Sequence, residues 1–223
     1  MAGARALAFR TEQLAEGVTL YCGDMMEVLP QLGEFDACVT DPPYGIGISG
    51  NPVRQAHAKM DWDNAAPSPE AFAMMRDKAK HLIIWGGNYF DLPPMQGFFV
   101  WDKVQPENFS LAMCEQAWTN IKKPAKLFKR HVVSFSKEHP TQKPLELMEW
   151  CVEQLPVDVG SIVDPYMGSG TTGVAAVKRG KAFYGIEREP SYFDIAVRRI
   201  SEALKQFDMF IERPAPAKQE ALL

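Results

Sequence analysis

The tetrapeptide Asp41-Pro42-Pro43-Tyr44 brings a carboxylate, a backbone carbonyl and an aromatic ring together within four residues. It follows the apolar segment 35–40, whose composition is typical of a buried strand. Because proline lacks the N–H that a central strand needs, we predict that the strand ends here in a rigid turn. Such a turn suits a planar group that carries an NH2, since the oxygens accept its hydrogens and the ring stacks on its face. The alternative is a simple strand end in which Tyr44 only packs.

A second motif, in residues 161–173, combines a short apolar strand with a glycine-rich turn. The strand ends at Asp164, and glycines follow at positions 168, 170 and 173 before a helix-like run. Glycine allows a tight turn and the close approach of a ligand to the backbone. A second apolar run ends at Glu187, about 20 residues further on, where a carboxylate can accept hydrogen bonds from ribose hydroxyls. The motif predicts a nucleoside cofactor, either a dinucleotide or S-adenosylmethionine, and its alternative is a glycine turn without a ligand.

Together the two motifs resemble the amino-group DNA methyltransferases of the permuted β class, in which the catalytic tetrapeptide precedes the cofactor glycines. Two further segments carry this resemblance. His139–Met148 is similar to the family segment that opens a helix before the cofactor strand. Leu20–Asp24 is similar to a family strand that ends in an acid near the cofactor adenine. The matches run in family order over roughly residues 18 to 200.

The resemblance implies a site-specific enzyme of the restriction-modification kind that transfers a methyl group from S-adenosylmethionine to the 6-amino group of adenine in DNA. Asp41 and the Pro42 carbonyl would accept the two amino hydrogens, Pro43 would stiffen the turn, and Tyr44 would stack on the flipped base. The family usually has Asp at the first position for adenine and Ser for cytosine. The cofactor residues that the resemblance implies are Asp24, Asp164, Tyr166, Gly168, Ser169, Gly170, Thr171 and Glu187, with Thr141 and Lys143 near the methionine end.

Several other activities are compatible with parts of the pattern. Within the same chemistry, the acceptor could be the 4-amino group of cytosine in DNA, or a base in RNA. An NAD-dependent dehydrogenase would share the glycine turn and Glu187, but it leaves the tetrapeptide unexplained. A non-catalytic DNA-binding relative is expected to have lost Asp41 or the glycines, and this chain keeps both.

The charge distribution bears on DNA as a partner. The net charge is −4, but overall charge matters less than where the basic residues lie. A segment without acidic residues holds Lys122, Lys123, Lys126, Lys129 and Arg130, and we predict that it contacts phosphates. A smaller group, Arg54 and Lys59, follows the tetrapeptide and is a second candidate for DNA contact. The alternative for both groups is an ordinary solvated surface.

The composition fits one globular domain of 223 residues, 46% of them hydrophobic and 23% charged. No apolar stretch is long enough to predict a transmembrane helix, and the first ten residues lack the apolar core of a secretion signal. The four cysteines form no Cys-x-x-Cys pair, so we expect no metal site. We expect a cytoplasmic protein that is encoded by a bacterium or a phage.

Strands that alternate with helices imply a mostly parallel α/β sheet, whose ligands bind beyond the carboxyl ends of the strands. The resemblance implies a single Rossmann-like class I methyltransferase domain, with a seven-stranded sheet that has one antiparallel strand and helices on both faces. We expect a loose lead-in at 1–17, the domain at 18–207 and a disordered tail at 208–223. Strands are predicted at 81–85, 97–101, 114–119 and 131–135, and the last helix at 191–207.

Target recognition is the main departure from larger relatives, which carry a bulky recognition region before the segment equivalent to 139–148. Here the corresponding stretch is the short basic segment 120–138. The recognised DNA sequence is then short or relaxed, or the specificity comes from a predicted mobile loop at 45–68 or from a second subunit. A homodimer is therefore our hypothesis for the assembly.

Overall fold

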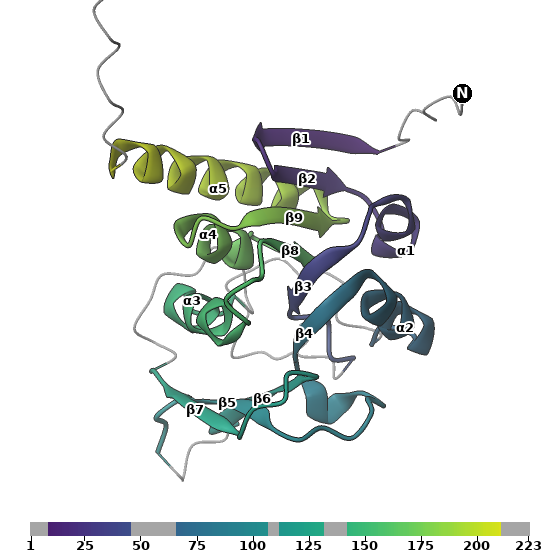
Figure 1. Ribbon diagram of the computed structural model, residues 1–223, viewed down its shortest axis with the longest axis vertical. Coiled ribbons are helices and arrows are strands. Elements are labelled where there is room, and N and C mark those ends of the chain that lie inside the picture. The colour runs from purple at the N-terminus through teal and green to yellow at the C-terminus, as the bar shows by residue number, and fades with distance from the viewer. Residues whose placement is uncertain (1–8, 46–65, 107–111, 132–141, 211–223) are drawn as a thin grey trace, which may run out of the picture.

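The computed structural model describes residues 9–45, 66–106, 112–131 and 142–210, which form one α/β unit around a central sheet (Figure 1). The strands are β1 (Arg10–Ala15), β2 (Val18–Cys22), β3 (Phe35–Thr40), β4 (Ala79–Trp85), β5 (Phe98–Asp102), β6 (Cys114–Thr119), β7 (Lys126–Lys129), β8 (Ser161–Asp164) and β9 (Ala182–Glu187). The α-helices are α1 (Met25–Val28), α2 (Pro69–Lys78), α3 (Leu145–Gln154), α4 (Thr171–Lys178) and α5 (Pro190–Phe210), with short 3₁₀ helices η1 (Leu29–Gln31) and η5 (Gly87–Tyr89).

The strand order is β1-β2-β9-β8-β3-β4-β6-β5-β7, which makes nine strands within the described residues. The pairs β2–β9, β9–β8, β8–β3 and β3–β4 are all parallel. Among the described strands, β1 and β6 run antiparallel to their neighbours. The prediction of a mostly parallel sheet is confirmed.

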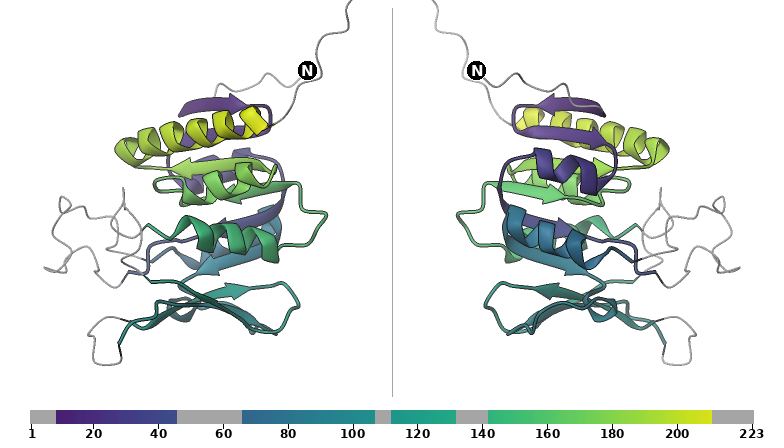
Figure 2. Two further views of the ribbon diagram at one scale, coloured as in Figure 1. Left: turned by 90° about the vertical axis from the view of Figure 1, so that its left-hand side faces the viewer. Right: turned by 90° about the vertical axis from the view of Figure 1, so that its right-hand side faces the viewer.

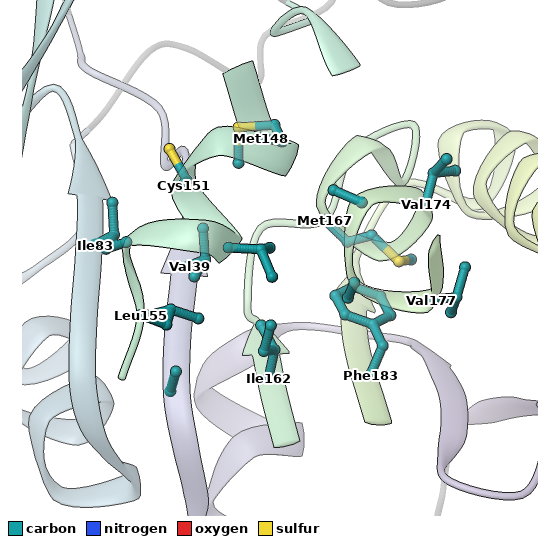
Figure 3. Packing of buried hydrophobic residues seen from close by; sticks show 14 of the residues in the cluster. Val39, Ile83, Met148, Cys151, Leu155, Ile162, Met167, Val174, Val177 and Phe183 are labelled. Carbon is teal, nitrogen blue, oxygen red and sulfur yellow. The ribbon is translucent and has the colours of Figure 1, made fainter. Parts of the chain in front are cut away.

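Helices cover both faces of the sheet, with α3, α4 and α5 on one side and α1 and α2 on the other (Figures 1 and 2). The central strands are largely buried on both faces, which is why most of their residues are apolar. In β3, for example, Ala37 and Val39 pack into the cluster beneath α3 and α4, while Cys38 packs into the cluster beneath α1 and α2. Figure 3 shows the first cluster, where Val39, Ile83 and Phe183 of the sheet lie beneath α3 and α4.

Three predictions about the elements differ from the structure. The lead-in 1–17 contains β1, which is held by antiparallel pairing with β2 and by a 2.8 Å ion pair between Arg10 and Asp194 of α5. The sheet has nine strands within the described residues, where seven were expected, because β1 and the short strand β7 extend its two edges. The last helix continues three residues beyond the predicted end and finishes at Phe210. Most of the predicted loop 45–68 and of the strand 131–135 falls outside the described residues.

The pairing of β3 with β8 sets the position of both motifs. Ala37 lies opposite Ile162 and Cys38 opposite Val163 in parallel register, so the turns that follow the two strands emerge at the same edge of the sheet. At the start of the pair, the Asp36 carboxylate accepts hydrogen bonds from the backbone N–H of Ser161 and from that of Gly160, each at 2.8 Å.

A second acid closes the other end of the β3–β8 pair. The Asp164 carboxylate accepts hydrogen bonds from the Thr40 hydroxyl at 2.6 Å and from the Tyr166 N–H at 3.1 Å. Burial raises the pKa of Asp164 to about 6, against the effect of its hydrogen-bond donors. The backbone N–H groups of Gly160 and Ser161 instead lower the pKa of Asp36. The two acids hold the same pair of strands, but their pKa values are shifted in opposite directions.

Among the helices that the structure describes, none combines the length and the hydrophobicity of a membrane-spanning segment. The described residues also contain no group of three or more His, Cys, Asp or Glu side chains that could hold a metal ion.

The opposite pKa shifts of Asp164 and Asp36 predict opposite pH dependences of the free energy of unfolding. Because the folded state holds the Asp164 proton more tightly than the unfolded chain, ionising Asp164 costs stability as the pH rises through about 6. Asp164→Asn should therefore gain about 2 kcal/mol relative to wild type between pH 4 and pH 7, in urea unfolding. Asp36→Asn is the comparison variant: because the folded state lowers the pKa of Asp36, the stability that this carboxylate gives wild type should be present from pH 4 to pH 7 and be lost as the pH falls below the usual Asp pKa of 3.8. If both variants shift in the same direction, this account of the β3–β8 ends is wrong.

Candidate active site

The Asp41 carboxylate lies just beyond β3, in the turn made by the two prolines. Its Oδ1 accepts a hydrogen bond from the Tyr44 hydroxyl at 2.7 Å, and its Oδ2 lies 2.7 Å from the Lys143 Nζ. Burial raises the pKa of Asp41, and the Lys143 ammonium partly opposes that rise. The turn thus presents a partly buried carboxylate whose two oxygens both face hydrogen-bond donors of the protein itself.

The Tyr44 ring is held by close packing on η5 and on the residue before it. It stacks on the Tyr89 ring with 5.0 Å between centroids and 21° between planes. Gly86, at φ +77°, packs so closely that a Cβ atom there would overlap the Tyr44 ring. Burial raises the pKa of the Tyr44 hydroxyl well above its usual value, so the hydroxyl stays protonated and donates to Asp41. Tyr44 and the exposed Tyr89 form an aromatic surface beside the carboxylate.

A chain of alternating charges continues from Asp41 into the sheet. The Lys143 Nζ, on a side chain 6% exposed, also lies 2.9 Å from Oε2 of Glu115 in β6. Lys103 follows β5 and places its Nζ 2.5 Å from the other Glu115 oxygen. Burial alone would raise the pKa of Glu115, but Lys143 and Lys103 lower it to about 2. The order is Asp41, Lys143, Glu115 and Lys103, with each positive charge next to a negative one.

The glycine turn lies between β8 and α4. Gly168 has φ +54°, and a Cβ built there would meet nothing within 4 Å, so the backbone borders open space. The Glu187 carboxylate, at the end of β9, accepts hydrogen bonds from the N–H of Gly168 and from that of Glu189, each at 2.8 Å. Asp24, beyond the neighbouring strand β2, caps α1 by accepting a 2.8 Å bond from the Met26 N–H. The two acids that we expected near a nucleoside therefore follow adjacent strands.

Arg199 of α5 holds this turn from the other side. Its Nη1 donates to the Ser169 carbonyl at 2.6 Å, to the Ser169 hydroxyl at 2.9 Å and to the Thr171 hydroxyl at 3.2 Å. We did not predict this role, because an arginine within an amphipathic helix resembles a surface residue in sequence. Arg199 fixes the backbone at the N-terminus of α4, where a ligand would approach.

One pocket unites the two motifs. Its lining includes Asp41 of the proline turn, Lys143 before α3, and Tyr166, Gly168, Ser169 and Thr171 of the glycine turn. Asp164 is 2% exposed and bonds to Thr40 and Tyr166, so its contacts support the turn from within. Lys143 also lines the pocket, and its ammonium pairs with Asp41 and Glu115. Its predicted place at the methionine end of a cofactor stays a prediction. Thr141 lies outside the described residues.

The basic residues predicted to contact DNA divide into two groups. Lys122, Lys126 and Lys129 are exposed on and around β7. Lys123 donates to the Gln154 carbonyl at 2.5 Å, and Arg130 forms a 3.0 Å ion pair with Glu146, so both also join the segment to α3. Arg54 and Lys59 lie outside the described residues. DNA contact by all of these residues stays a prediction.

Sequence comparison finds that a model of a DNA methylase family matches residues 59–198. The Type II methyltransferase M2.DpnII of Streptococcus pneumoniae is 30% identical over 139 residues, which is 62% of this chain and 48% of that protein. The Type II methyltransferase M.ScaI of Streptomyces caespitosus is 26% identical over 250 residues, covering 82% of this chain and 81% of that protein. The chain therefore spans about half the length of the first of these relatives.

Two solved structures resemble most of this chain. The crystal structure of the M1.HpyAVI-SAM complex has a TM-score of 0.57 and 25% identity, covering 81% of this chain and 98% of that one. The PvuII DNA methyltransferase, titled cytosine-N4-specific, has a TM-score of 0.56 at 17% identity, covering 84% of this chain and 91% of that one. At that lower identity the second likeness concerns the fold alone.

The packing of Tyr44 against Gly86 predicts a position-specific cost. Gly86→Ala should lower the free energy of unfolding by about 1–3 kcal/mol, because it adds a side chain at positive φ and pushes it into the Tyr44 ring. Gly33→Ala is the matched control, since a Cβ there meets nothing within 4 Å, and it should change stability by less than about 0.5 kcal/mol. Equal effects in denaturant unfolding would show that Gly86 does not hold the ring.

Proposed function

The chain belongs to the DNA methylase family, and we propose that it transfers a methyl group from S-adenosylmethionine to the exocyclic 6-amino group of adenine in DNA. The observation that carries this proposal is the single pocket lined by both Asp41 and the Gly168-Ser169 turn. A methyl donor on the glycine turn and a base at Asp41 would then meet without any rearrangement of the sheet.

The glycine turn suits S-adenosylmethionine. Gly168 borders open space, Arg199 fixes the following residues, and Asp24 and Glu187 stand at the ends of adjacent strands. Asp24, Glu187, Tyr166 and the turn would hold the cofactor, which supplies a methyl group already activated by its sulfonium charge. The complex of M1.HpyAVI with SAM, in a fold that this chain shares, supports the same choice.

Asp41 would make the amino group of the base a better nucleophile. An amino group on a base is a poor nucleophile, because its lone pair is delocalised into the ring. In our proposal, Asp41 and the Pro42 carbonyl accept the two amino hydrogens, which draws the lone pair outward and stabilises the positive charge that develops on nitrogen. The base leaves the duplex to reach this partly buried position, and it packs beside the aromatic surface that Tyr44 and Tyr89 form.

The choice of adenine rests on Asp at the first position of the tetrapeptide, by the resemblance described above. Cytosine presents the same kind of NH2 group, and the DNA methylase family model does not separate the two. A base in RNA, a homodimer and a place in a restriction-modification pair stay hypotheses, the last supported by the Type II names of the relatives. A nicotinamide dehydrogenase gains no support from the family match.

Cofactor choice can be measured directly. Isothermal titration calorimetry should detect binding of S-adenosylhomocysteine at one site per chain and no binding of NAD. Arg199→Met should weaken that binding by about tenfold, because the Ser169 backbone loses its anchor. Arg198→Met, next to it on α5, is the control and should bind like wild type. Binding of NAD in place of S-adenosylhomocysteine would reject the proposal.

Turnover tests the role of Asp41. Transfer of labelled methyl to duplex DNA, followed by nucleoside analysis, should yield N6-methyladenine, and N4-methylcytosine would reassign the base. Asp41→Ala should lower the rate by about 10²–10³, on the order of 3–4 kcal/mol, while S-adenosylhomocysteine binding survives. Asp77→Ala, at an exposed position of α2, is the control. Undiminished turnover by Asp41→Ala would eliminate this mechanism.

A further inference from the structure

The catalytic carboxylate is already occupied by the protein's own donors. Oδ1 of Asp41 accepts from the Tyr44 hydroxyl and Oδ2 from the Lys143 ammonium, both at 2.7 Å. An amino group that donates to Asp41 needs a lone pair facing the pocket, so it competes with these two donors. Lys143 is the competitor on the pocket side, because both Lys143 and Asp41 line the pocket.

The Lys143 ammonium can leave Asp41 at little cost in free energy, because Glu115 is already in place as a second acceptor. Its Nζ lies 2.9 Å from Glu115 Oε2, so a small movement keeps the ammonium paired with a carboxylate. The Tyr44 hydroxyl has a poorer alternative, because the same Glu115 oxygen lies 3.4 Å away and the ring is held by Gly86 and Tyr89. A buried ammonium that lost Asp41 without Glu115 would be left uncompensated.

Glu115 is itself fixed and charged. Its other oxygen pairs with Lys103 at 2.5 Å, and the Lys103 ammonium lies 5.3 Å from the centroid of the Trp101 ring. Glu115 faces Trp101 across the β5–β6 ladder, so its backbone cannot shift without the sheet. The carboxylate therefore stays in place while the lysine moves.

We propose that Glu115 is a positioning residue that receives the Lys143 ammonium when the target amino group binds Asp41, an inference that rests on the proposed function. Transfer of the ammonium frees Oδ2 of Asp41 for the amino hydrogen. It also moves a positive charge away from the nitrogen on which positive charge develops during methyl transfer. Glu115 thus acts on the reaction through Lys143 and Asp41, without touching the base.

The acid side of the pH profile reports this arrangement, because Asp41 must be ionised to accept the amino hydrogens. The titratable groups that face Asp41 and Lys143 are Tyr44, Glu115, Asp164 and Cys151, and Lys103 faces the other oxygen of Glu115. Burial raises the pKa of Asp41, Glu115 raises it further and Lys143 lowers it. Removing Glu115 and removing Lys143 therefore shift the pKa of Asp41 in opposite directions.

The test compares Glu115→Gln, Lys143→Met and the control Glu153→Gln, which removes a carboxylate from an ion pair with Arg179 at the surface of α3. Active sites are counted by the stoichiometry of S-adenosylhomocysteine binding, so that unfolded protein does not enter the rates. For Glu115→Gln we expect kcat/KM for DNA to fall on the order of 10–100-fold, with S-adenosylhomocysteine affinity unchanged. The acid limb of kcat/KM should move to lower pH in Glu115→Gln and to higher pH in Lys143→Met, and stay in place in Glu153→Gln.

The outcomes separate the two proposals. A wild type that transfers no methyl group to DNA rejects the proposed function and, with it, the role of Glu115. An active wild type whose Glu115→Gln variant keeps the same kcat/KM and the same acid limb rejects the role of Glu115 alone. A variant that loses S-adenosylhomocysteine affinity in proportion to kcat/KM shows a structural role, which also overturns the inference.

Discussion

The parallel pairing of β3 with β8 is the constraint on which the site depends. These strands lie more than 120 residues apart in the chain, as the 124-residue separation of Thr40 and Asp164 shows. Parallel strands end at the same edge, so the proline turn and the glycine turn emerge side by side. Asp36 at one end and Asp164 at the other hold the register, and a slip by one residue would turn the side chains to the opposite face.

Burying four charges beside that edge is costly unless each is compensated. The protein meets this cost by alternation, with Lys143 between Asp41 and Glu115 and Lys103 beyond Glu115. Burial raises the pKa of Asp41, and the Lys143 ammonium opposes that rise, so the arrangement favours the ionised carboxylate, which is a strong acceptor. Stability and chemistry are coupled here, because the cation that holds the carboxylate in the folded protein also covers the oxygen that a substrate needs.

Much of the fold follows from local patterns. The central strands, apolar on both faces, and the Gly-x-Gly-x-x-Gly turn were predictable because short-range sterics and burial dictate them. The edge strands were not, since β1 and the four residues of β7 are partly exposed and have weak patterns. Glu115 and Lys103 belong to the site but lay within or next to a predicted strand, with no motif to mark them. Glu115 lies in the polar first half of β6, beside Gln116, so no pattern in the sequence singles it out.

The order of amino acids specifies which groups are available: a carboxylate stiffened by two prolines, a glycine turn, and acids at the ends of strands. These follow from the backbone limits of proline and glycine, which act within a few residues. Which of these groups face one another depends on the packing of elements that are distant in the chain. Lys143 became the partner of Asp41, and Arg199 the anchor of Ser169, because sheet order and helix packing set distances between side chains that are remote in the chain.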